Sequence, residues 1–399
     1  MKQLFTIIFL TFFAGLNAQH VSYDPISPLE NYDFVLGTQG IGGKYKFSHE
    51  SALVEQAKHI RAMGSNILKI SLGKNALDSY GLGKKTVHNT LDLFNASPDF
   101  KQVFDMDFKY IFAWVHTCTD VNWKKGISPM EEKILYDEMY DFASYLLKSY
   151  NDSGKTFLIG NWEGDWLLHN GNGRESTPDS KIIRNMTKWF QIRQRAIDDA
   201  KKNVPHVNVS IYYYIELNLV LKGMKGEKCI AESVLPKVPV DLVSYSSYEA
   251  IKNRSKAEVY ETLDSVFNYL ESKLEPKPGL PFSRRVYIGE YGYQANAKKP
   301  ETFEKQYNKT KDLMEIALKL NLPFALHWEM YNNEYDNKGN SKQMSLINEE
   351  GEKRPLYYLH KNYYEKMNDY LKSYKSENNQ YPAQEEFNKK ALSVLEELN

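Results

Sequence analysis

Short apolar segments alternate with longer amphipathic segments along most of this 399-residue chain, and this alternation restricts the possible folds most strongly. The apolar segments are almost continuously hydrophobic, which is typical of strands buried on both faces of a parallel sheet. We predict strands at residues 34–36, 66–72, 110–115, 156–162, 207–215, 240–245, 285–290 and 323–329.

Amphipathic segments follow these strands and predict the helices of the same units. The expected helices cover residues 50–63, 129–148, 180–202, 256–274, 302–320 and 357–374, with a helical or irregular connection at 91–104 and a weaker helical segment near 231–235. Alternating units predict an α/β architecture, and eight of them at this length favour a (β/α)8 TIM barrel. The alternative is an open doubly wound sheet. Its dinucleotide-binding form has Gly-x-Gly-x-x-Gly after the first strand, whereas the glycines of residues 37–43 are spaced differently.

The first 18 residues resemble a secretory signal peptide. Lys2 supplies the positive charge, residues 4–13 are apolar, and small residues up to Ala18 allow cleavage there. The apolar stretch is short for a bilayer span, which needs about 20 residues. We therefore expect an exported protein, secreted or periplasmic, without a membrane span.

The rest of the chain is expected to form one catalytic barrel over residues 19–374, because no internal boundary stands out. Residues 375–399 begin with a polar linker and continue as a short charged helix over 385–398. This tail is either a solvated extension, a cap under the barrel or a segment that binds a partner.

Charge and cysteine content exclude several classes of protein. Lys and Arg number 51 and Asp and Glu also number 51, so a broad basic field for nucleic acid is absent. Cys118 and Cys229 are too few for a disulfide framework or a structural zinc site, and the sequence leaves open whether they pair. His116 and Asp120 have no further ligand types nearby. We expect no metal and no cofactor.

In a barrel of this kind the reactive groups stand at the carboxyl ends of the strands, where two carboxylates are distinctive. Glu163 follows the fourth strand between two tryptophans, which would reduce its solvation and raise its pKa. Glu290 ends the seventh strand between Gly289 and Gly292, small neighbours that would let a ligand approach. Such a pair can supply the acid and the nucleophile of glycoside hydrolysis. The alternative for either residue is a salt-bridged position on the rim.

This pattern resembles the clan A glycoside hydrolases, from about residue 33 to residue 374. The resemblance implies a retaining enzyme with Glu163 as acid/base, Glu290 as nucleophile and Trp328 as the floor of a sugar subsite. The stretch Ile-Gly-Glu-Tyr-Gly at 288–292 carries the match most specifically. At the fourth strand Trp162 separates Asn161 from Glu163, whereas the family usually has Asn directly before the acid/base. A retaining pair implies carboxyl groups about 5–5.5 Å apart.

Other polar and aromatic residues at the strand ends are candidates for contacts with a poly- or oligosaccharide. Tryptophan rings suit the apolar faces of sugars, although each could instead be a core residue. Tyr245 could orient the nucleophile, or be a core tyrosine, and Glu216 and Asn218 belong either to the barrel mouth or to a loop. The candidate binding residues are Asn161, Trp162, Trp328, Tyr245, His116 and Trp114, with Trp166 as a further stacking candidate.

Two other functions fit parts of the pattern. A non-catalytic carbohydrate-binding barrel would use the same aromatic cleft, but it would need neither Glu163 nor Glu290. A metal-dependent barrel hydrolase would need clusters of His and Asp ligands, which the strand ends do not show. The sequence leaves open the sugar, the linkage and whether the action is endo or exo.

Overall fold

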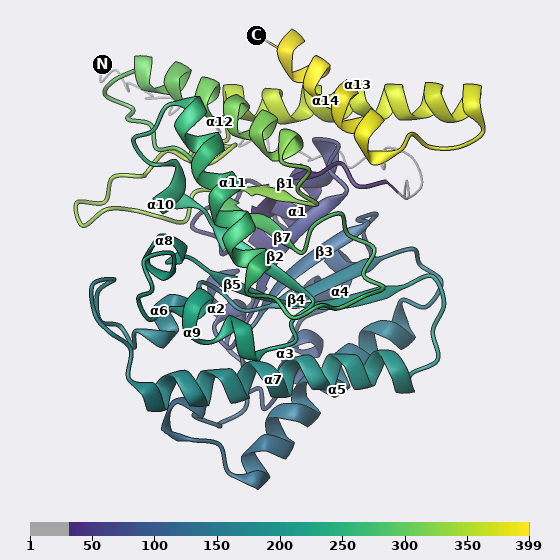
Figure 1. Ribbon diagram of the computed structural model, residues 1–399. Coiled ribbons are helices and arrows are strands. Elements are labelled where there is room, and N and C mark those ends of the chain that lie inside the picture. The colour runs from purple at the N-terminus through teal and green to yellow at the C-terminus, as the bar shows by residue number, and fades with distance from the viewer. Residues whose placement is uncertain (1–31, 399) are drawn as a thin grey trace, which may run out of the picture.

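Eight parallel strands close into a barrel in the computed structural model, which describes residues 32–398 (Figure 1). Each strand pairs with the next along the chain, and β8 pairs with β1. The strands are β1 (Leu36–Gly40), β2 (Ile67–Leu72), β3 (Tyr110–Val115), β4 (Thr156–Gly160), β5 (Ser210–Leu217), β6 (Leu242–Ser246), β7 (Val286–Tyr291) and β8 (Ala325–His327). The predicted (β/α)8 barrel is confirmed, and the predicted signal peptide lies outside the described residues.

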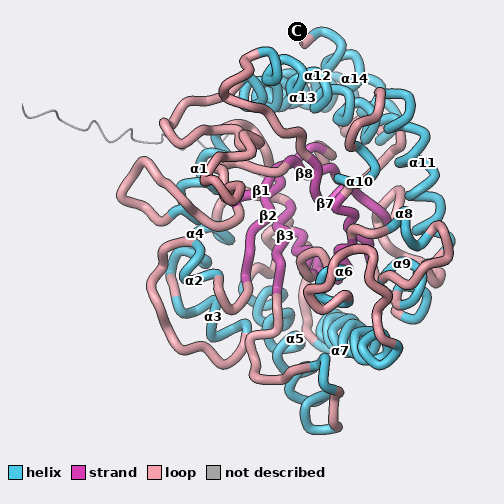
Figure 2. The backbone as a smooth tube through the Cα atoms, turned by 90° about the vertical axis from the view of Figure 1, so that its left-hand side faces the viewer, coloured by secondary structure: helices cyan, strands magenta, loops and turns pink. Residues whose placement is uncertain are grey.

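Helices form a layer outside the strands, as Figure 2 shows in cyan around magenta. The longer ones are α1 (Ala52–Ala62), α3 (Thr90–Ala96), α4 (Pro98–Asp105), α5 (Pro129–Ser149), α7 (Ser180–Asn203), α11 (Lys256–Ser272), α12 (Glu301–Lys319), α13 (Pro355–Asn378) and α14 (Gln384–Glu397). Shorter helices are α2 (Ala76–Ser79), α6 (Gly164–Leu168), α8 (Val220–Gly223), α9 (Ile230–Ser233) and α10 (Tyr248–Ile251), with 3₁₀ turns η1 (Trp123–Lys125) and η2 (Leu235–Lys237). No helix within residues 32–398 has the length and hydropathy that crossing a bilayer requires.

Local sequence accounts for where several helices begin. Ser128 and Ser255 each cap a helix in a capping box with the glutamate three residues later, at the starts of α5 and α11. Both α4 and α5 also have proline at the first helical position, where its missing N–H costs nothing. These signals explain why α5 and α11 begin at the predicted residues.

The first strand differs from the prediction, which placed it at residues 34–36. The observed β1 has the sequence Leu-Gly-Thr-Gln-Gly and is buried throughout, although it lacks an apolar run. A Cβ on Gly37 would lie 2.7 Å from the Ile67 side chain and 2.9 Å from that of Leu326. The narrow barrel interior therefore requires glycine here, and this requirement weakens the hydrophobic pattern by which a strand is recognised.

Large side chains fill the interior of the barrel below its carboxyl end. The rings of Phe112 and Phe324 meet edge to face at 4.9 Å, and Tyr287 packs against both. The interior cluster consists of Ile41, Ile67, Phe112, Trp114, Leu158, Tyr214, Leu242, Tyr287, Phe324, Leu326, Trp328 and Met344. A barrel filled in this way is a core rather than a pore, so a site has room only at the strand ends.

The C-terminal tail is packed against the barrel rather than extended into solvent. Helix α14 lies beside α12 and α13 and buries Phe387, Ala391 and Leu395 (Figure 1). The Phe387 ring lies 4.7 Å from that of Tyr32, just before β1. Because α13 continues to Asn378, the linker between α13 and α14 covers only residues 379–383.

Candidate active site

A cleft of about 830 Å³ opens at the carboxyl ends of the strands, and both predicted carboxylates line it. Glu163 reaches it from the end of β4 and Glu290 from β7, while Trp328 follows β8. The lining residues are Trp162, Glu163, Trp166, Arg174, Asn218, Ser246, Tyr248, Glu249, Ile251, Lys252, Asn253, Glu290, Gly292, Tyr293, Gln294, Thr302, Lys305, Gln306, Lys309, Trp328, Asn333, Glu334, Lys342 and Met344.

Glu163 lies just beyond β4, at the residue that precedes α6. Its Oε2 accepts a hydrogen bond of 2.6 Å from the indole N–H of Trp166, and its backbone N–H donates to Oε1 of Glu216 at 3.2 Å. Burial, followed by the negative charge of Glu216, raises the pKa of Glu163 from 4.5 to about 7. This carboxyl group can therefore hold a proton close to neutral pH.

Glu290 lies within β7 and is only 3 % exposed. The hydroxyl of Tyr248 donates to its Oε2 at 3.3 Å, and the Lys69 ammonium lies 3.8 Å from its Oε1. Burial raises the pKa of Glu290 well above 4.5, and the charges of Glu216 and Glu163 add to this shift, whereas the positive charge of Lys69 and the hydrogen bond from Tyr248 oppose it. The ionised form of this carboxylate thus has a cation and a donor beside it.

A third carboxylate, Glu216 of β5, is fully buried beneath these two. Its Oε2 accepts from the Lys69 ammonium at 2.7 Å and from the Ser244 hydroxyl at 2.8 Å. Lys69 also donates to the Gly289 carbonyl at 3.1 Å and lies 4.3 Å from the centre of the Trp114 ring. The ion pair therefore connects β2, β5 and β7 below the cleft.

Sequence analysis left the position of Glu216 open and did not identify Lys69. A signal was present in β2, whose sequence Ile-Leu-Lys-Ile-Ser-Leu places a lysine inside an apolar strand. A charge buried in such a strand needs an opposite charge, and the inward-facing Glu216 supplies it. Which carboxylate pairs with Lys69 follows only from the closure of the barrel.

The glycines beside Glu290 serve packing. A Cβ on Gly289 would lie 1.7 Å from the Ser244 hydroxyl and 3.0 Å from Oε2 of Glu216, and one on Gly292 would lie 2.9 Å from the Trp328 carbonyl. Gly289 therefore makes room for the hydrogen bond between Ser244 and Glu216. The predicted reason, access for a ligand to the backbone, is replaced at Gly289 by this interior contact.

The tryptophans divide into two groups. Trp162, Trp166 and Trp328 line the cleft, and Trp162 is 36 % exposed. Trp114 is not among the described residues that line it. Its ring packs 5.9 Å from that of Trp328 and below Lys69, so the core alternative fits Trp114.

Tyr245 does not make the contact with the nucleophile that its position at the end of β6 suggested. Its hydroxyl donates to Glu249 at 3.3 Å, and Tyr248, three residues later in α10, contacts Glu290 instead. Tyr245 is fully buried and packs edge to face on Phe267 of α11, so its ring belongs to the layer between sheet and helices.

Asn161 and His116 also lie away from the described lining of the cleft. The Asn161 amide donates to the Glu216 carbonyl at 3.0 Å and accepts from the Glu216 N–H at 3.3 Å, so it joins β4 to β5. The His116 ring packs beside Gly73. Burial and the nearby Arg193 charge lower the pKa of His116 to about 4. The ring is therefore uncharged at neutral pH.

Cysteines and metal-ligand types form no second centre in the described part of the chain. Cys118 and Cys229 are both free and buried, and burial raises the pKa of each thiol to about 12. Among residues 32–398, no group of three or more His, Cys, Asp or Glu side chains is placed to hold a metal ion.

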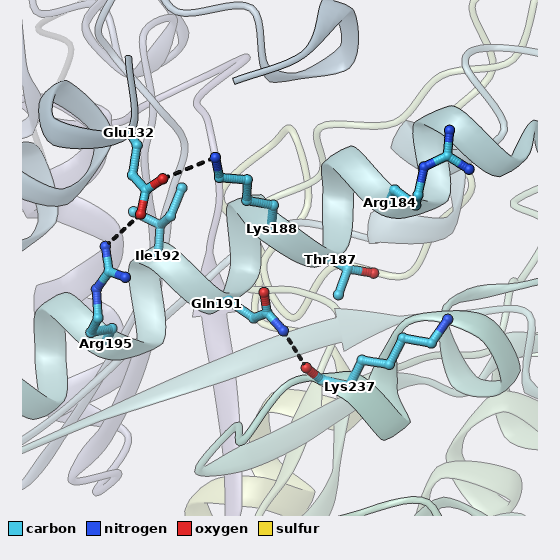
Figure 3. A pocket seen from close by; sticks show the side chains of 8 residues that line it. All are labelled: Glu132, Arg184, Thr187, Lys188, Gln191, Ile192, Arg195 and Lys237. Carbon is cyan, nitrogen blue, oxygen red and sulfur yellow. Dashed lines mark hydrogen bonds and ion pairs between the residues drawn. The ribbon is translucent and has the colours of Figure 1, made fainter. Parts of the chain in front are cut away.

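A smaller hollow of about 310 Å³ lies on the outer helices α5 and α7 and at η2 (Figure 3). Its one carboxylate, Glu132, is 2.9 Å from the charged nitrogens of both Lys188 and Arg195. The hollow shares no lining residue with the cleft. Glu132 thus pairs with two of the four cationic residues of this hollow, on the side of the barrel.

Comparison with solved structures places the fold among known barrels, whereas no family model and no curated protein matches the sequence. An exo-β-1,4-mannosidase from Opitutaceae bacterium strain TAV5 matches with a TM-score of 0.55 and 9 % identity, over 84 % of this chain and 60 % of that one. A family 5 xyloglucanase from Paenibacillus pabuli matches with a TM-score of 0.50 and 11 % identity, over 91 % and 99 %.

A β-glucuronidase from Bacteroides uniformis matches with a TM-score of 0.51 and 10 % identity. The match covers 84 % of this chain but 35 % of the β-glucuronidase, so this chain spans about a third of that protein. At such low identity these likenesses concern the fold. The chain thus has a (β/α)8 barrel similar to the barrels of these three glycoside hydrolases.

Proposed function

We propose that this protein is a retaining glycoside hydrolase in which Glu163 is the acid/base and Glu290 the nucleophile. The observation that carries the proposal is that carboxylates from β4 and β7 line one cleft in two different electrostatic settings. The mannosidase, xyloglucanase and β-glucuronidase with similar barrels support this class of reaction.

The first step would break the glycosidic bond. Protonated Glu163 gives its proton to the leaving oxygen while the Glu290 carboxylate attacks the anomeric carbon and forms a glycosyl-enzyme ester. In the second step Glu163 removes a proton from water, the water attacks the same carbon, and Glu290 leaves. The first step therefore requires a proton on Glu163, and the second requires Glu163 to be ionised.

We infer that this proton is on Glu163. Three carboxylates, of Glu163, Glu216 and Glu290, surround one buried cation, Lys69, so their mutual repulsion favours keeping a proton. Lys69 lies 3.8 Å from Glu290, which also accepts from the Tyr248 hydroxyl, whereas Glu163 accepts from the Trp166 N–H and forms no ion pair with a described residue. This difference supports Glu290 as the ionised nucleophile and Glu163 as the protonated acid.

The tryptophans of the cleft suit a carbohydrate substrate, and the expected export suits a polymer met outside the cell. Trp162 and Trp328 present rings on which apolar sugar faces can stack. Export rests on the N-terminal pattern alone and is part of the proposal. Sequencing the mature N-terminus from the native host would test it, with Gln19 expected as the first residue.

Activity on a panel of poly- and oligosaccharides, with released reducing ends as the readout, tests the proposed reaction. We expect hydrolysis of at least one glycan, and Glu290→Ala should lose about 10⁴-fold or more of that rate. Glu396→Ala, a matched change at an exposed position on α14, should keep the wild-type rate. Glycan binding without hydrolysis anywhere on the panel would instead favour the non-catalytic barrel.

A further inference from the structure

One wall of the cleft carries lysines that the proposed hydrolytic steps do not use. Five cationic residues line the cleft, namely Arg174, Lys252, Lys305, Lys309 and Lys342. Lys342 is 2.8 Å from Glu334 and is neutralised by it. None of the other four forms an ion pair with a residue of the described range 32–398. Lys252, Lys305 and Lys309 therefore form a cationic wall, provided by α12 and the residue that follows α10.

The spacing of two of these lysines points to a ligand rather than to helix stability. Lys305 and Lys309 are four residues apart on α12, so both face the cleft on one side of the helix. Like charges at this spacing repel one another and weaken a helix. The charge of the neighbouring Lys256, in contrast, is neutralised by carboxylates, because its ammonium is 2.8 Å from both Asp312 and Glu315. An anion between Lys305 and Lys309 would remove their repulsion.

The position of Lys309 is fixed by neighbouring groups. Its ammonium donates to the Arg254 carbonyl at 3.3 Å and lies 5.3 Å from the centre of the Tyr293 ring. Between the two lysines, the Gln306 amide donates to the carbonyls of Tyr293 at 2.6 Å and Gln343 at 2.7 Å. These bonds hold the segment after β7 against α12, so the wall is a built part of the cleft.

The acidic residues of the cleft do not neutralise this wall. Glu334 pairs with Lys342, and Glu249 is directed inward, where it accepts from the Leu221 N–H at 2.9 Å and from Tyr245. Glu163 and Glu290 remain, and the proposed chemistry uses both. No carboxylate among the described residues of the lining pairs with Lys252, Lys305 or Lys309, so the α12 side of the cleft carries positive charge.

We propose that the cleft binds an anionic glycan, whose carboxylate or sulfate substituent is held by Lys252, Lys305 and Lys309. This inference rests on the proposed function for the glycan but not on hydrolysis for its test. Carboxylate and sulfate oxygens both accept hydrogen bonds from ammonium groups, so the shared chemistry is an anionic group on a sugar ring. The cationic wall of this partly enclosed cleft would also attract such a polymer at low salt.

Affinity electrophoresis of the inactive Glu290→Gln variant measures binding while the polymer stays intact. Glucuronoxylan, polygalacturonate and hyaluronan are each compared with their carboxyl-reduced forms, and carrageenan and dermatan sulfate with desulfated forms. We expect at least one anionic polymer to retard the protein about tenfold more strongly than its neutral counterpart, and 0.5 M salt to abolish the difference. The arm that retards the protein identifies the substituent as carboxylate or sulfate.

Removing the wall should weaken this preference. Lys305→Gln with Lys309→Gln, in the same background, should bind the anionic polymer about tenfold more weakly and the neutral one unchanged. The control, Lys202→Gln with Lys389→Gln, removes the same charge from exposed positions on α7 and α14 and should change neither. The two single variants repeat the test if the double variant unfolds.

Equal retardation by every anionic polymer and its neutral form would overturn the inference, as would an unchanged preference in the Lys305 and Lys309 variants. Hydrolysis of neutral glycans would then leave the proposed function standing alone. A charge preference without hydrolysis of any glycan by the wild-type protein would instead support the anionic ligand and remove the proposed reaction.

Discussion

The ends of β4 and β7 each provide a glutamate to the same cleft, but the backbone positions of the two glutamates differ. Glu290 is part of a strand, so its carboxylate points over the filled barrel interior, where Lys69 and Tyr248 meet it. Glu163 follows its strand, and its side chain lies partly exposed against Trp166. The strand position is closer to buried charge, and the loop position is nearer to solvent.

This difference shows how one residue type can serve two roles. A nucleophile needs its carboxylate ionised and fixed, which the strand, the lysine and the tyrosine favour. An acid/base must lose and regain a proton in each cycle, and a pKa of about 7 suits that exchange. Changes at each strand end should therefore produce different kinetic defects.

After loss of the nucleophile, the largest expected effect is that of Glu163→Ala on substrates with poor leaving groups. Without the proton of Glu163, hydrolysis of natural glycans should fall about 10³- to 10⁴-fold. The first step on an aryl glycoside with a good leaving group should fall far less. The wild-type rate should decrease as the pH rises through about 7, because the acid is then ionised, and the first step of the variant should lack this decrease.

Rate measurements on a series of aryl glycosides of differing leaving-group pKa, from pH 5 to 9, would check this. An equal loss on all members of the series would show that Glu163 is not the acid.

A smaller effect is expected from Tyr248→Phe, which removes one hydroxyl from the side of Glu290. Loss of a hydrogen bond to a charged group should lower kcat about 10- to 100-fold. It should also raise the pKa of Glu290, so the acidic limb of the pH profile should move to higher pH.

Tyr245→Phe is the matched control, because its hydroxyl contacts Glu249 instead. Its kcat should change less than about threefold, and its acidic limb should stay in place. A larger kinetic effect at Tyr245 than at Tyr248 would return the orienting role to Tyr245.

The smallest effect concerns stability. The pKa of Glu163 is raised in the folded protein, so its contribution to stability is present below about pH 4.5 and is lost as the pH rises through about 7. Glu163→Gln cannot ionise and keeps an acceptor for Trp166. We expect it to be more stable than wild type by about 1–3 kcal/mol at pH 8 and about equal at pH 4.5. Calorimetric Tm values at both pH values test this, with Glu396→Gln as control.

The strands that the sequence predicted well are those whose burial depends on their own hydrophobicity. β3 begins and ends at the predicted residues, and the carboxylates at the ends of β4 and β7 reach the cleft. The prediction misplaced β1 because Ile67 and Leu326 leave room only for glycine at position 37, and glycine does not contribute to a hydrophobic pattern. Local patterns thus locate a strand better than they predict what surrounds it.

Local sequence patterns also failed to predict some contacts within the site. The pairing of Lys69 with Glu216 joins residues 147 positions apart, so no local spacing predicts it. The confusion between Tyr245 and Tyr248 has another cause, since three residues at a strand end separate a side chain facing the helices from one facing the cleft. The closure of the barrel determines the pairing of Lys69 with Glu216. The direction of the chain after β6 determines which tyrosine contacts Glu290.

Azide rescue of the two alanine variants tests the division of roles most directly. In Glu163→Ala, azide should replace the missing base and give a glycosyl azide of retained configuration. In Glu290→Ala, azide should attack from the side of the lost nucleophile and give the inverted product. The product configurations, read by nuclear magnetic resonance, would contradict the account if they were exchanged between the variants, or if Glu216→Ala rather than Glu290→Ala gave the inverted azide.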